Sequence, residues 1–287
     1  MLTIFNKEFK SYFHSYIGYI FLIVFLLISG LLFTLSNLLP GNGFYNDLIY
    51  SMNYIFLFLA PLLTMKLISN ETHERTDQLL FTSPVKLWEI VLGKFLAASA
   101  IFLIAVIITF AYPLILSHFG TIPAGEIIGA YIGFILMGMC FISIGLFVSS
   151  LTDNQVTAAF GTFGALFFIW LIDWLTSALP TSVISGIIFC VLLVLFICLI
   201  IYNNTNNIYL SICFGVLSSV IILAIYFVNK SIYDSLIVNF FGWFSLLKRY
   251  EPFNIGMLNL SSIVYYITFC ITFIFLTIKT IDKRRWN

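Results

Sequence analysis

The sequence predicts an all-α, polytopic membrane protein with about eight transmembrane helices. Apolar residues make up 61% of the 287 residues, charged residues only 9%, and the mean hydropathy is +1.09. A soluble domain carries about 25% charged residues, so this composition is typical of an integral membrane protein. The formal net charge of only +1 gives no indication of a nucleic-acid partner.

Residues 1–15 predict an amphipathic helix that precedes the first span. Apolar residues alternate here with Lys7, Glu8 and Lys10, which favours a helix on the membrane surface with its lysines toward anionic head groups. A frayed tail is the alternative. The apolar run that follows is longer than the core of a signal peptide and no small-residue cleavage site follows it, so we expect a retained first span.

Eight apolar stretches reach the length of about 20 residues that a membrane-spanning helix requires. They are Tyr16–Leu38, Tyr50–Ser69, Ile90–Leu116, Ile127–Ser150, Val156–Leu175, Val183–Tyr202, Tyr209–Val228 and Ile263–Ile281. Pro113 predicts a kink in the third of them. Glycines that predict close helix approach are Gly133, Gly138, Gly145, Gly161 and Gly164.

A ninth apolar run, Leu236–Leu247, is too short to cross upright. It lies in segment 229–261, which we expect to form a re-entrant or surface helix on the extracytoplasmic side. Asp173, in the outer part of the fifth span, either lines a polar pathway or reaches the outer head groups.

A polar stretch interrupts the first half of the chain, with its centre at residues 70–89. Each charge at a bilayer centre costs about 2.5–3.5 kcal/mol, so the four charged residues between Glu71 and Asp77 place this stretch outside the hydrocarbon. The absence of Gly and Pro predicts a helix over Glu71–Leu80, supported by the spacing of Glu71 and Arg75.

Ser83-Pro84 then predicts a break and the start of a new helix over Val85–Lys94. The apolar tip Leu79, Leu80 and Phe81 fits a partner protein; a loop that inserts its apolar residues into lipid is the alternative. We expect the lysines at the ends of the adjacent spans, Lys66 and Lys94, to snorkel toward water.

The distribution of cations predicts the orientation. If both termini are in the cytoplasm, ten cations lie on the cytoplasmic side of the membrane or at its cytoplasmic edge. The other three, Lys230, Lys248 and Arg249, lie on the outer side. The polar stretch is then cytoplasmic. High Ile, Phe and Asn usage indicates an AT-rich bacterial genome, and hence a bacterial cytoplasmic membrane.

Sequence motifs for catalysis are lacking. Gly93-Lys94 has no earlier glycine and is followed by Phe95, so it fails the Walker A pattern, and neither GxSxG nor HExxH occurs. The five cysteines lie in apolar runs without paired spacing, which predicts neither a disulfide frame nor a metal site. We therefore expect that this chain is not an enzyme and binds no cofactor.

Four segments together resemble ABC-2 type permeases, and most of all the gliding-motility-associated exporter group. They are the run Glu71–Ala97 with its Arg75-Thr76, Leu79-Leu80, Ser83-Pro84, Trp88-Glu89 and Gly93-Lys94-Phe95, the hairpin Ile142–Phe163, the segment Ser245–Gly256, and the terminal Arg284-Arg285-Trp286. Permeases of this kind typically have six spans, so the hairpin Val183–Val228 is an addition.

The resemblance implies a single transmembrane domain over residues 1–287 that acts as the permease of an ATP-binding cassette exporter. It implies a cytoplasmic ATPase partner that holds ATP and Mg, a second permease copy or a paralogue, membrane lipids, and an accessory membrane or extracytoplasmic protein. The implied ATPase-coupling residues are Glu71, Glu74, Arg75, Thr76, Leu79, Leu80 and Phe81. Implied elbow-helix residues are Phe5, Lys7 and Phe9, and those of an outer gate are Leu247, Arg249, Tyr250 and Phe253.

Two other classes of function stay open from the residues alone. One is an ion-coupled secondary transporter or a channel without an ATPase, although no repeated pair of broken helices is visible. The other is a membrane enzyme or an assembly scaffold, which would need catalytic groups that these motifs do not supply.

Overall fold

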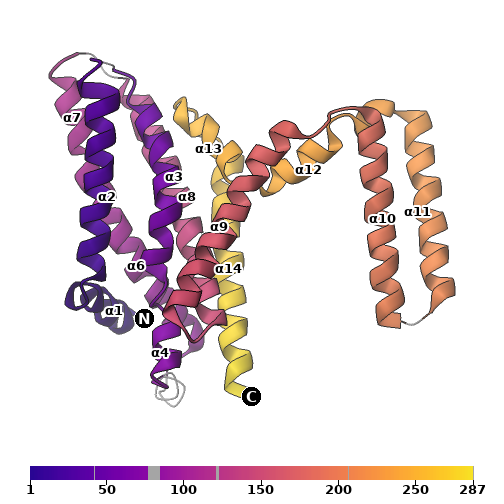
Figure 1. Cartoon of the computed structure of the whole chain (residues 1–287), viewed down its shortest axis with the longest axis horizontal. Helices are drawn as coiled ribbons and strands as arrows, with labels where there is room; N and C mark the ends of the chain where they lie inside the picture. The colour runs from indigo at the N-terminus through magenta and orange to yellow at the C-terminus, as the bar shows by residue number, and fades with distance from the viewer. Residues whose placement is uncertain (42, 77–84, 121–122, 206, 287) are drawn as a thin grey trace. The chain divides into compact units, whose positions relative to one another are not determined.

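The computed structural model describes the chain except for residues 42, 77–84, 121–122, 206 and 287, and the described residues contain helices and no strand (Figure 1). The elements are α1 (Leu2–His14), α2 (Ile17–Phe33), the π-helix η1 (Thr34–Leu38), α3 (Asn46–Thr64), α4 (Ser69–His73), α6 (Leu87–Thr109), α7 (Ala111–Ser117), α8 (Ala124–Leu151), α9 (Gln155–Ala178), α10 (Val183–Thr205), α11 (Ile208–Val228), the 3₁₀ helix η2 (Lys230–Tyr233), α12 (Leu236–Phe244), α13 (Leu247–Asn254) and α14 (Leu260–Trp286).

Eight helical segments among the described residues are long and apolar enough to cross a bilayer. They are Ile17–Leu38, Asn46–His73, Leu87–Ser117, Ala124–Leu151, Gln155–Ala178, Val183–Asn203, Ile208–Val228 and Leu260–Arg284. Each corresponds to one of the eight predicted spans, so the predicted all-α, multi-pass membrane fold is confirmed. The ninth apolar run forms the nine-residue helix α12, too short to span, as predicted.

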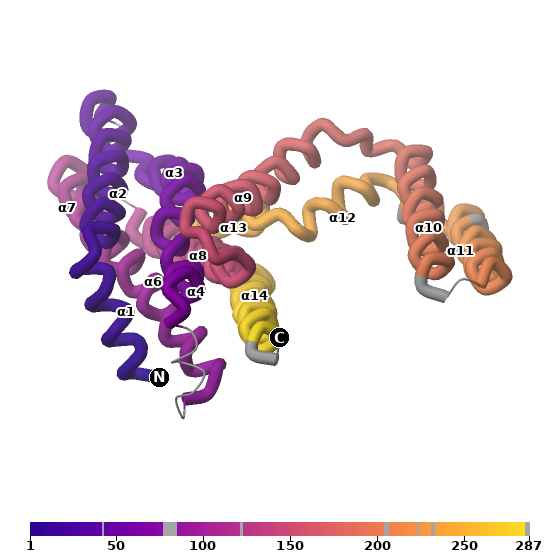
Figure 2. The backbone as a smooth tube through the Cα atoms, turned by 60° about the horizontal axis from the view of Figure 1, so that its bottom comes forward, coloured from indigo at the N-terminus to yellow at the C-terminus, as the bar shows by residue number. Residues whose placement is uncertain are grey.

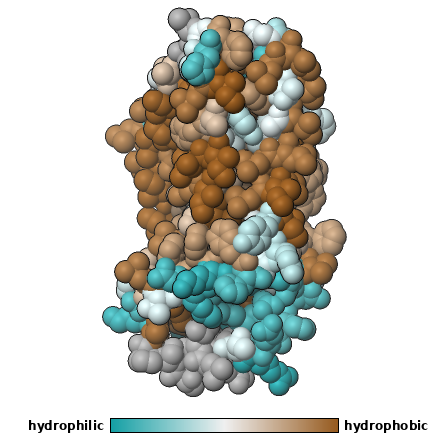
Figure 3. Space-filling view, turned by 90° about the vertical axis from the view of Figure 1, so that its left-hand side faces the viewer, coloured by the Kyte–Doolittle hydropathy of each residue, from teal (hydrophilic) through white to brown (hydrophobic). Residues whose placement is uncertain are grey.

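The chain forms two compact units, residues 1–168 with 249–287, and residues 169–248. In the first unit α8 is the central helix, with α3 and α14 packed against it, and α2 packs on α3. Figure 1 shows both termini and α4 at one end of this unit, and α7 and α13 at the other. Seen from the side of α2, the surface is brown through its middle and teal toward the end where α1 lies (Figure 3).

Glycines let other groups approach α8 closely. A Cβ added at Gly145 would lie 2.2 Å from the Thr64 hydroxyl, and one at Gly138 would lie 2.4 Å from the Phe102 ring. An added Cβ would also lie too close to Phe253 at Gly133, and too close to Val148 at Gly161. These four confirm the predicted close approaches. At Gly164 no such approach is seen among the described residues, because an added Cβ would meet none of their atoms within 4 Å.

The third span breaks where Pro113 predicts a kink. Pro113 has no N–H to donate to the carbonyl of Thr109, four residues earlier, and α6 ends at that residue. Tyrosine hydroxyls replace the missing donor: that of Tyr131 donates to the Thr109 carbonyl at 3.0 Å, and that of Tyr45 is hydrogen-bonded to the Tyr131 hydroxyl at 2.6 Å. The break is thus satisfied inside the helix bundle rather than by water.

The helix predicted over Glu71–Leu80 is wrong over its described part. The helix α4 begins at Ser69 and ends at His73, and Arg75 has a left-handed φ of +57°. The rest of the predicted helix and the break at Ser83-Pro84 lie outside the described residues. The next helix begins at Leu87, two residues after the predicted start, and Glu89 accepts a hydrogen bond from the N–H of Lys86 at 3.4 Å.

The second unit contains the additional hairpin, α10 and α11, which pack against each other. The hydroxyl of Ser211 donates to the carbonyl of Cys198 at 2.8 Å, and Gly186 lies directly against the backbone of Tyr233. Most apolar side chains of this hairpin are exposed, as expected of helices that face lipid.

Replacing Gly145 by Ala tests the packing of α3 on α8. The added methyl meets three atoms of Thr64 within 2.8 Å, so we expect the free energy of unfolding to fall by about 1–3 kcal/mol. Gly164→Ala is the matched control, since helix propensity alone predicts a gain of about 0.5–1 kcal/mol there. Denaturation of the two variants in detergent compares them; equal stability would contradict the packing.

Candidate functional site: a buried ion-pair cluster under the N-terminal helix

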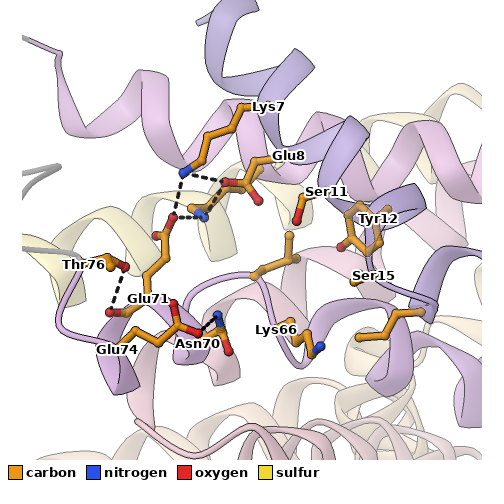
Figure 4. A pocket seen from close by; sticks show the side chains of 13 residues that line it. Lys7, Glu8, Ser11, Tyr12, Ser15, Lys66, Asn70, Glu71, Glu74 and Thr76 are labelled. Atoms are coloured by element: carbon orange, nitrogen blue, oxygen red, sulfur yellow. Dashed lines mark hydrogen bonds and ion pairs between the residues drawn. The ribbon is translucent and has the colours of Figure 1, made fainter.

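Four charged side chains from three separate segments meet at the end of the first unit where the termini lie. The ammonium of Lys94 on α6 is 3.0 Å from the Glu8 carboxylate on α1 and 2.9 Å from the Glu71 carboxylate on α4. Lys7 lies 3.7 Å from Glu8 and 3.6 Å from Glu71. We call these four residues the charge cluster; Figure 4 shows the ion pairs that join them.

Lys94 is the central residue of the charge cluster. Its side chain is only 2% exposed, against 13% for Glu8, 15% for Glu71 and 64% for Lys7. An unpaired ammonium at such a position would lose its hydration without compensation, which costs several kcal/mol. Two carboxylates at hydrogen-bonding distance supply that compensation, so α1 and α4 each contribute one partner to the buried ammonium.

A close helix crossing brings α1 to Lys94. Helix α1 lies across the ends of α2 and α6, as Figures 1 and 2 both show. At the adjacent Gly93, an added Cβ would lie 2.9 Å from the Ile4 side chain, so only glycine permits this approach. The hydroxyl of Tyr12 donates to the carbonyl of Leu63 at 2.6 Å, and burial raises the pKa of Tyr12, which keeps this donor protonated.

Helix α4 is fixed by side chains from other elements. The first N–H groups of a helix have no partner within it. Here the Ser149 hydroxyl at the end of α8 accepts from the N–H groups of Ile68 and Ser69 at 3.2 and 3.1 Å. Gln155, at the start of α9, donates to the side-chain carbonyl of Asn70.

The C-terminal helix also contacts α4. Arg284 on α14 donates to the Thr72 hydroxyl at 3.3 Å and lies 3.2 Å from the Asp153 carboxylate, in the loop between α8 and α9. Five helices therefore hold the short helix α4: α1 and α6 through the charge cluster, and α8, α9 and α14 through these hydrogen bonds.

A cavity of about 370 Å³ lies beside the charge cluster. Its wall is formed by α1 on one side and by the end of α3, α4 and the following turn on the other. Six of its side chains carry charge: Lys7, Lys66, Lys94, Glu8, Glu71 and Glu74. Figure 4 shows the side chains of Lys7, Glu8 and Glu71 directed toward one another, while Lys66 extends away from them.

The predicted coupling residues divide into buried and exposed groups. Glu71 is directed inward to Lys94, whereas Glu74 and Arg75 are exposed beyond it. Glu74 accepts from the Asn70 amide at 3.0 Å, and the N–H of Thr76 donates to the Glu71 carbonyl at 2.9 Å. The remaining predicted coupling residues, Leu79, Leu80 and Phe81, lie outside the described residues.

The predicted elbow-helix residues all lie on α1. The rings of Phe5 and Phe9 are stacked with centroids 5.7 Å apart, and Lys7 belongs to the charge cluster. Helix α1 forms over Leu2–His14, within the predicted 1–15.

The predicted outer-gate residues lie on α13. Within the first unit, Tyr250 and Phe253 are fully buried, and Tyr250 donates to the Ala130 carbonyl on α8 at 3.3 Å. The Arg249 guanidinium lies 3.9 Å from the centroid of the Tyr265 ring. Leu247 belongs to the second unit, as does Asp173, whose carboxylate accepts a hydrogen bond from the Ser245 hydroxyl.

Sequence reasoning missed the partners of Glu71. The prediction that Lys94 snorkels to water is wrong, because its ammonium is buried between two carboxylates. Glu8 and Lys94 are 86 positions apart, and nothing in the spacing of either residue indicates the other. The one signal was Gly93, whose lack of a side chain permits a helix crossing next to Lys94.

Lys94→Met tests whether the charge cluster holds the three segments together. It leaves Glu8 and Glu71 with only the exposed Lys7, so we expect the free energy of unfolding to fall by about 3 kcal/mol. The triple variant Lys94→Met, Glu8→Gln, Glu71→Gln removes the unpaired charges, and we expect it to recover much of that loss.

Lys10→Met on the exposed face of α1 is the matched control. Thermal and chemical denaturation in detergent measure all three proteins. A triple variant less stable than Lys94→Met alone would show that the ion pairs do not account for the loss.

Two comparisons with known proteins bear on the family. Residues 2–228 match the family model described as ABC-2 family transporter protein. A search of curated proteins found no match. The matched region includes α1, the charge cluster and seven of the eight spans. This chain belongs to the ABC-2 family of transporter proteins, whose permeases are membrane transport components that work with a cytoplasmic ABC ATPase.

Proposed function

We propose that this chain is the membrane-spanning permease subunit of an ATP-binding cassette exporter, and that residues 70–89 with α1 transmit movement from a separate ATPase. The observation that carries this proposal is the charge cluster, which ties α1, α4 and the start of the third span to one another. In this proposal the partner ATPase holds ATP and Mg, and the permease itself binds no cofactor.

The contacts of α4 support a mechanical route from the ATPase to the spans. A force applied next to α4 acts on the third span through Lys94, and on α8 through the Ser149 hydroxyl. It acts on the last span through the hydrogen bond from Arg284 to Thr72. These connections are short and partly buried, so the helices joined to α4 should move when α4 is displaced.

The exposed residues after α4 are the part of the polar stretch suited to contact a partner. His73, Glu74 and Arg75 are exposed, and the backbone turns sharply at Arg75 with its φ of +57°. Non-glycine residues rarely adopt this conformation, and such conformations concentrate at functional segments. We assign these residues, with Thr76, Leu79, Leu80 and Phe81, to the ATPase contact.

We further propose a bacterial cytoplasmic membrane location with both termini in the cytoplasm. Support comes from the ten cations that this orientation places inside or at the inner edge, against three outside. Within the same proposal a second copy or a paralogue completes the permease, an accessory membrane or extracytoplasmic protein assists it, and the chain falls in the gliding-motility-associated exporter group. Residues of α13, with Asp173, are assigned to the outer gate and the pathway.

Charge reversal at the exposed turn tests the ATPase contact. His73→Glu with Arg75→Glu changes only exposed groups, so we expect stability to be unchanged and association with the ATPase to weaken about tenfold, which corresponds to about 1.4 kcal/mol. Co-purification of nucleotide-binding subunits, identified by mass spectrometry, and ATPase stimulation measure this. Glu251→Lys, exposed on α13, is the control; undiminished association of the double variant would count against the contact.

Accessibility labelling tests the orientation. In a chain whose native cysteines are replaced by Ser, we expect a thiol introduced by Arg75→Cys to react with a membrane-impermeant maleimide only after the cells are opened. A thiol introduced by Glu251→Cys should react in intact cells, because α13 lies at the opposite end of the first unit. Labelling of position 75 from the external medium alone would overturn the orientation.

A further inference from the structure

Two of the charged side chains that line the cavity under α1 take no part in the ion pairs of the charge cluster. Three lysines and three glutamates contribute to its lining. Four of these six, the charge cluster, neutralise one another through the Lys94 and Lys7 ion pairs. That leaves one cation, Lys66, and one carboxylate, Glu74, in the same wall.

Neither of these two groups has an ion-pair partner within the part of the chain that the structure describes. Glu74 accepts one hydrogen bond, from the Asn70 amide. Lys66 is half-buried, and its side chain extends away from the charge cluster (Figure 4). A ligand that supplies both an anion and a cation would pair with both residues, whereas a simple anion would be repelled by Glu74.

Two serine hydroxyls, one on α1 and one directly after it, add donors to the same cavity. Ser11 and Ser15, four positions apart, both line it, and their side chains donate no hydrogen bond to any described residue. Hydroxyls and an ammonium together are donors that suit phosphate oxygens. A volume of about 370 Å³ is within the range of about 300–1,000 Å³ typical of small-ligand sites.

We propose that this cavity binds the phosphoethanolamine head group of a membrane phospholipid. Lys66 pairs with the phosphate, with Ser11 and Ser15 as hydrogen-bond donors, and Glu74 pairs with the primary ammonium. The head group then occupies a site next to α4, between α1 and the turn that follows α3. This inference goes beyond the proposed ATPase coupling. The two proposals share Glu74, and the binding test below uses the chain without an ATPase, so each can fail without the other.

The position of the cavity favours a lipid over a soluble phosphate ester. Helix α3 has 19 residues, a length of about 28 Å, close to the thickness of a hydrocarbon core of about 30 Å. Lys66 and Glu74 follow the end of α3, so a bilayer that α3 spans would have its head groups near them. Ile17, the first residue of α2, and Leu67 also line the cavity, so part of its wall is apolar; both side chains are buried within the protein.

The experiment titrates the detergent-solubilised full chain with soluble short-chain lipids and follows binding by native mass spectrometry. The probes are dihexanoyl phosphatidylethanolamine, its phosphatidylcholine and phosphatidylglycerol counterparts, and glycerophosphoethanolamine without acyl chains. We expect saturable binding in the order ethanolamine, then choline, then glycerol. The acyl-free ester should bind at least about tenfold more weakly than the lipid, because it lacks the apolar contacts.

Two single substitutions separate the roles of the two charged groups. Lys66→Gln should weaken binding of every phosphate probe about tenfold. Glu74→Gln should abolish the preference for ethanolamine over choline and glycerol while leaving phosphatidylglycerol bound as well as before or better. Lys10→Gln, exposed on α1 and outside the cavity, is the matched control and should change nothing; thermal denaturation confirms that all variants are folded.

Several results would overturn the proposal. Absence of saturable binding to the wild-type chain would show that the cavity holds only water. Tighter binding of phosphatidylglycerol than of phosphatidylethanolamine would show an anion site instead, and equal binding of the acyl-free ester would show a soluble ligand. Retention of the ethanolamine preference in Glu74→Gln would exclude the pairing on which the assignment depends.

Discussion

The buried ammonium of Lys94 is the constraint on which the arrangement of this end of the protein depends. Its desolvation is tolerable only while Glu8 and Glu71 both remain within about 3 Å of it. That requirement fixes α1 across the start of α6, and it fixes α4 under α1. A helix that a hydropathy pattern would place loosely on the membrane surface is thereby made a structural part of the bundle.

The same requirement determines which motions are inexpensive. Separating α4 from α6 would leave a carboxylate or the ammonium without its partner in a site that excludes most water, and this costs several kcal/mol. Moving α1, α4 and the start of α6 together costs none of these ion pairs. The hydrogen bonds from Ser149 and Arg284 extend this group to α8 and α14. A rigid-body displacement is therefore the movement that the contacts favour.

Much of the fold could be predicted from the sequence because membrane spans are encoded locally. Length and hydropathy are enough to predict the eight spans and the short helix α12. The missing N–H of Pro113 is enough to predict the break between α6 and α7. The length of α4 could not be predicted. Its N-terminal N–H groups are capped by Ser149 of another helix, a contact more than 80 positions away that helix propensity does not include.

The sequence indicated Glu71 and Lys7 as candidate residues but not the ion pairs that they form, and the difference lies in long-range pairing. Glu71 could be recognised as one of a run of polar residues, but the spacing pointed to Arg75 as its partner, and the structure gives Lys94. Likewise, the thiols of Cys140 and Cys270 lie 3.5 Å apart although nothing in their spacing pairs them. Helix crossings decide such partners, and a single sequence does not contain the crossings.

The described part of the polar stretch has a mostly buried side chain, Glu71, and exposed side chains that follow it. Glu71 is used internally, so changing it alters the permease itself before it alters any contact with a partner. Arg75 and the residues beside it contribute nothing to the charge cluster and are exposed to the surroundings. One short segment thus directs Glu71 inward to Lys94 and leaves Glu74 and Arg75 exposed, although these residues are only a few positions apart.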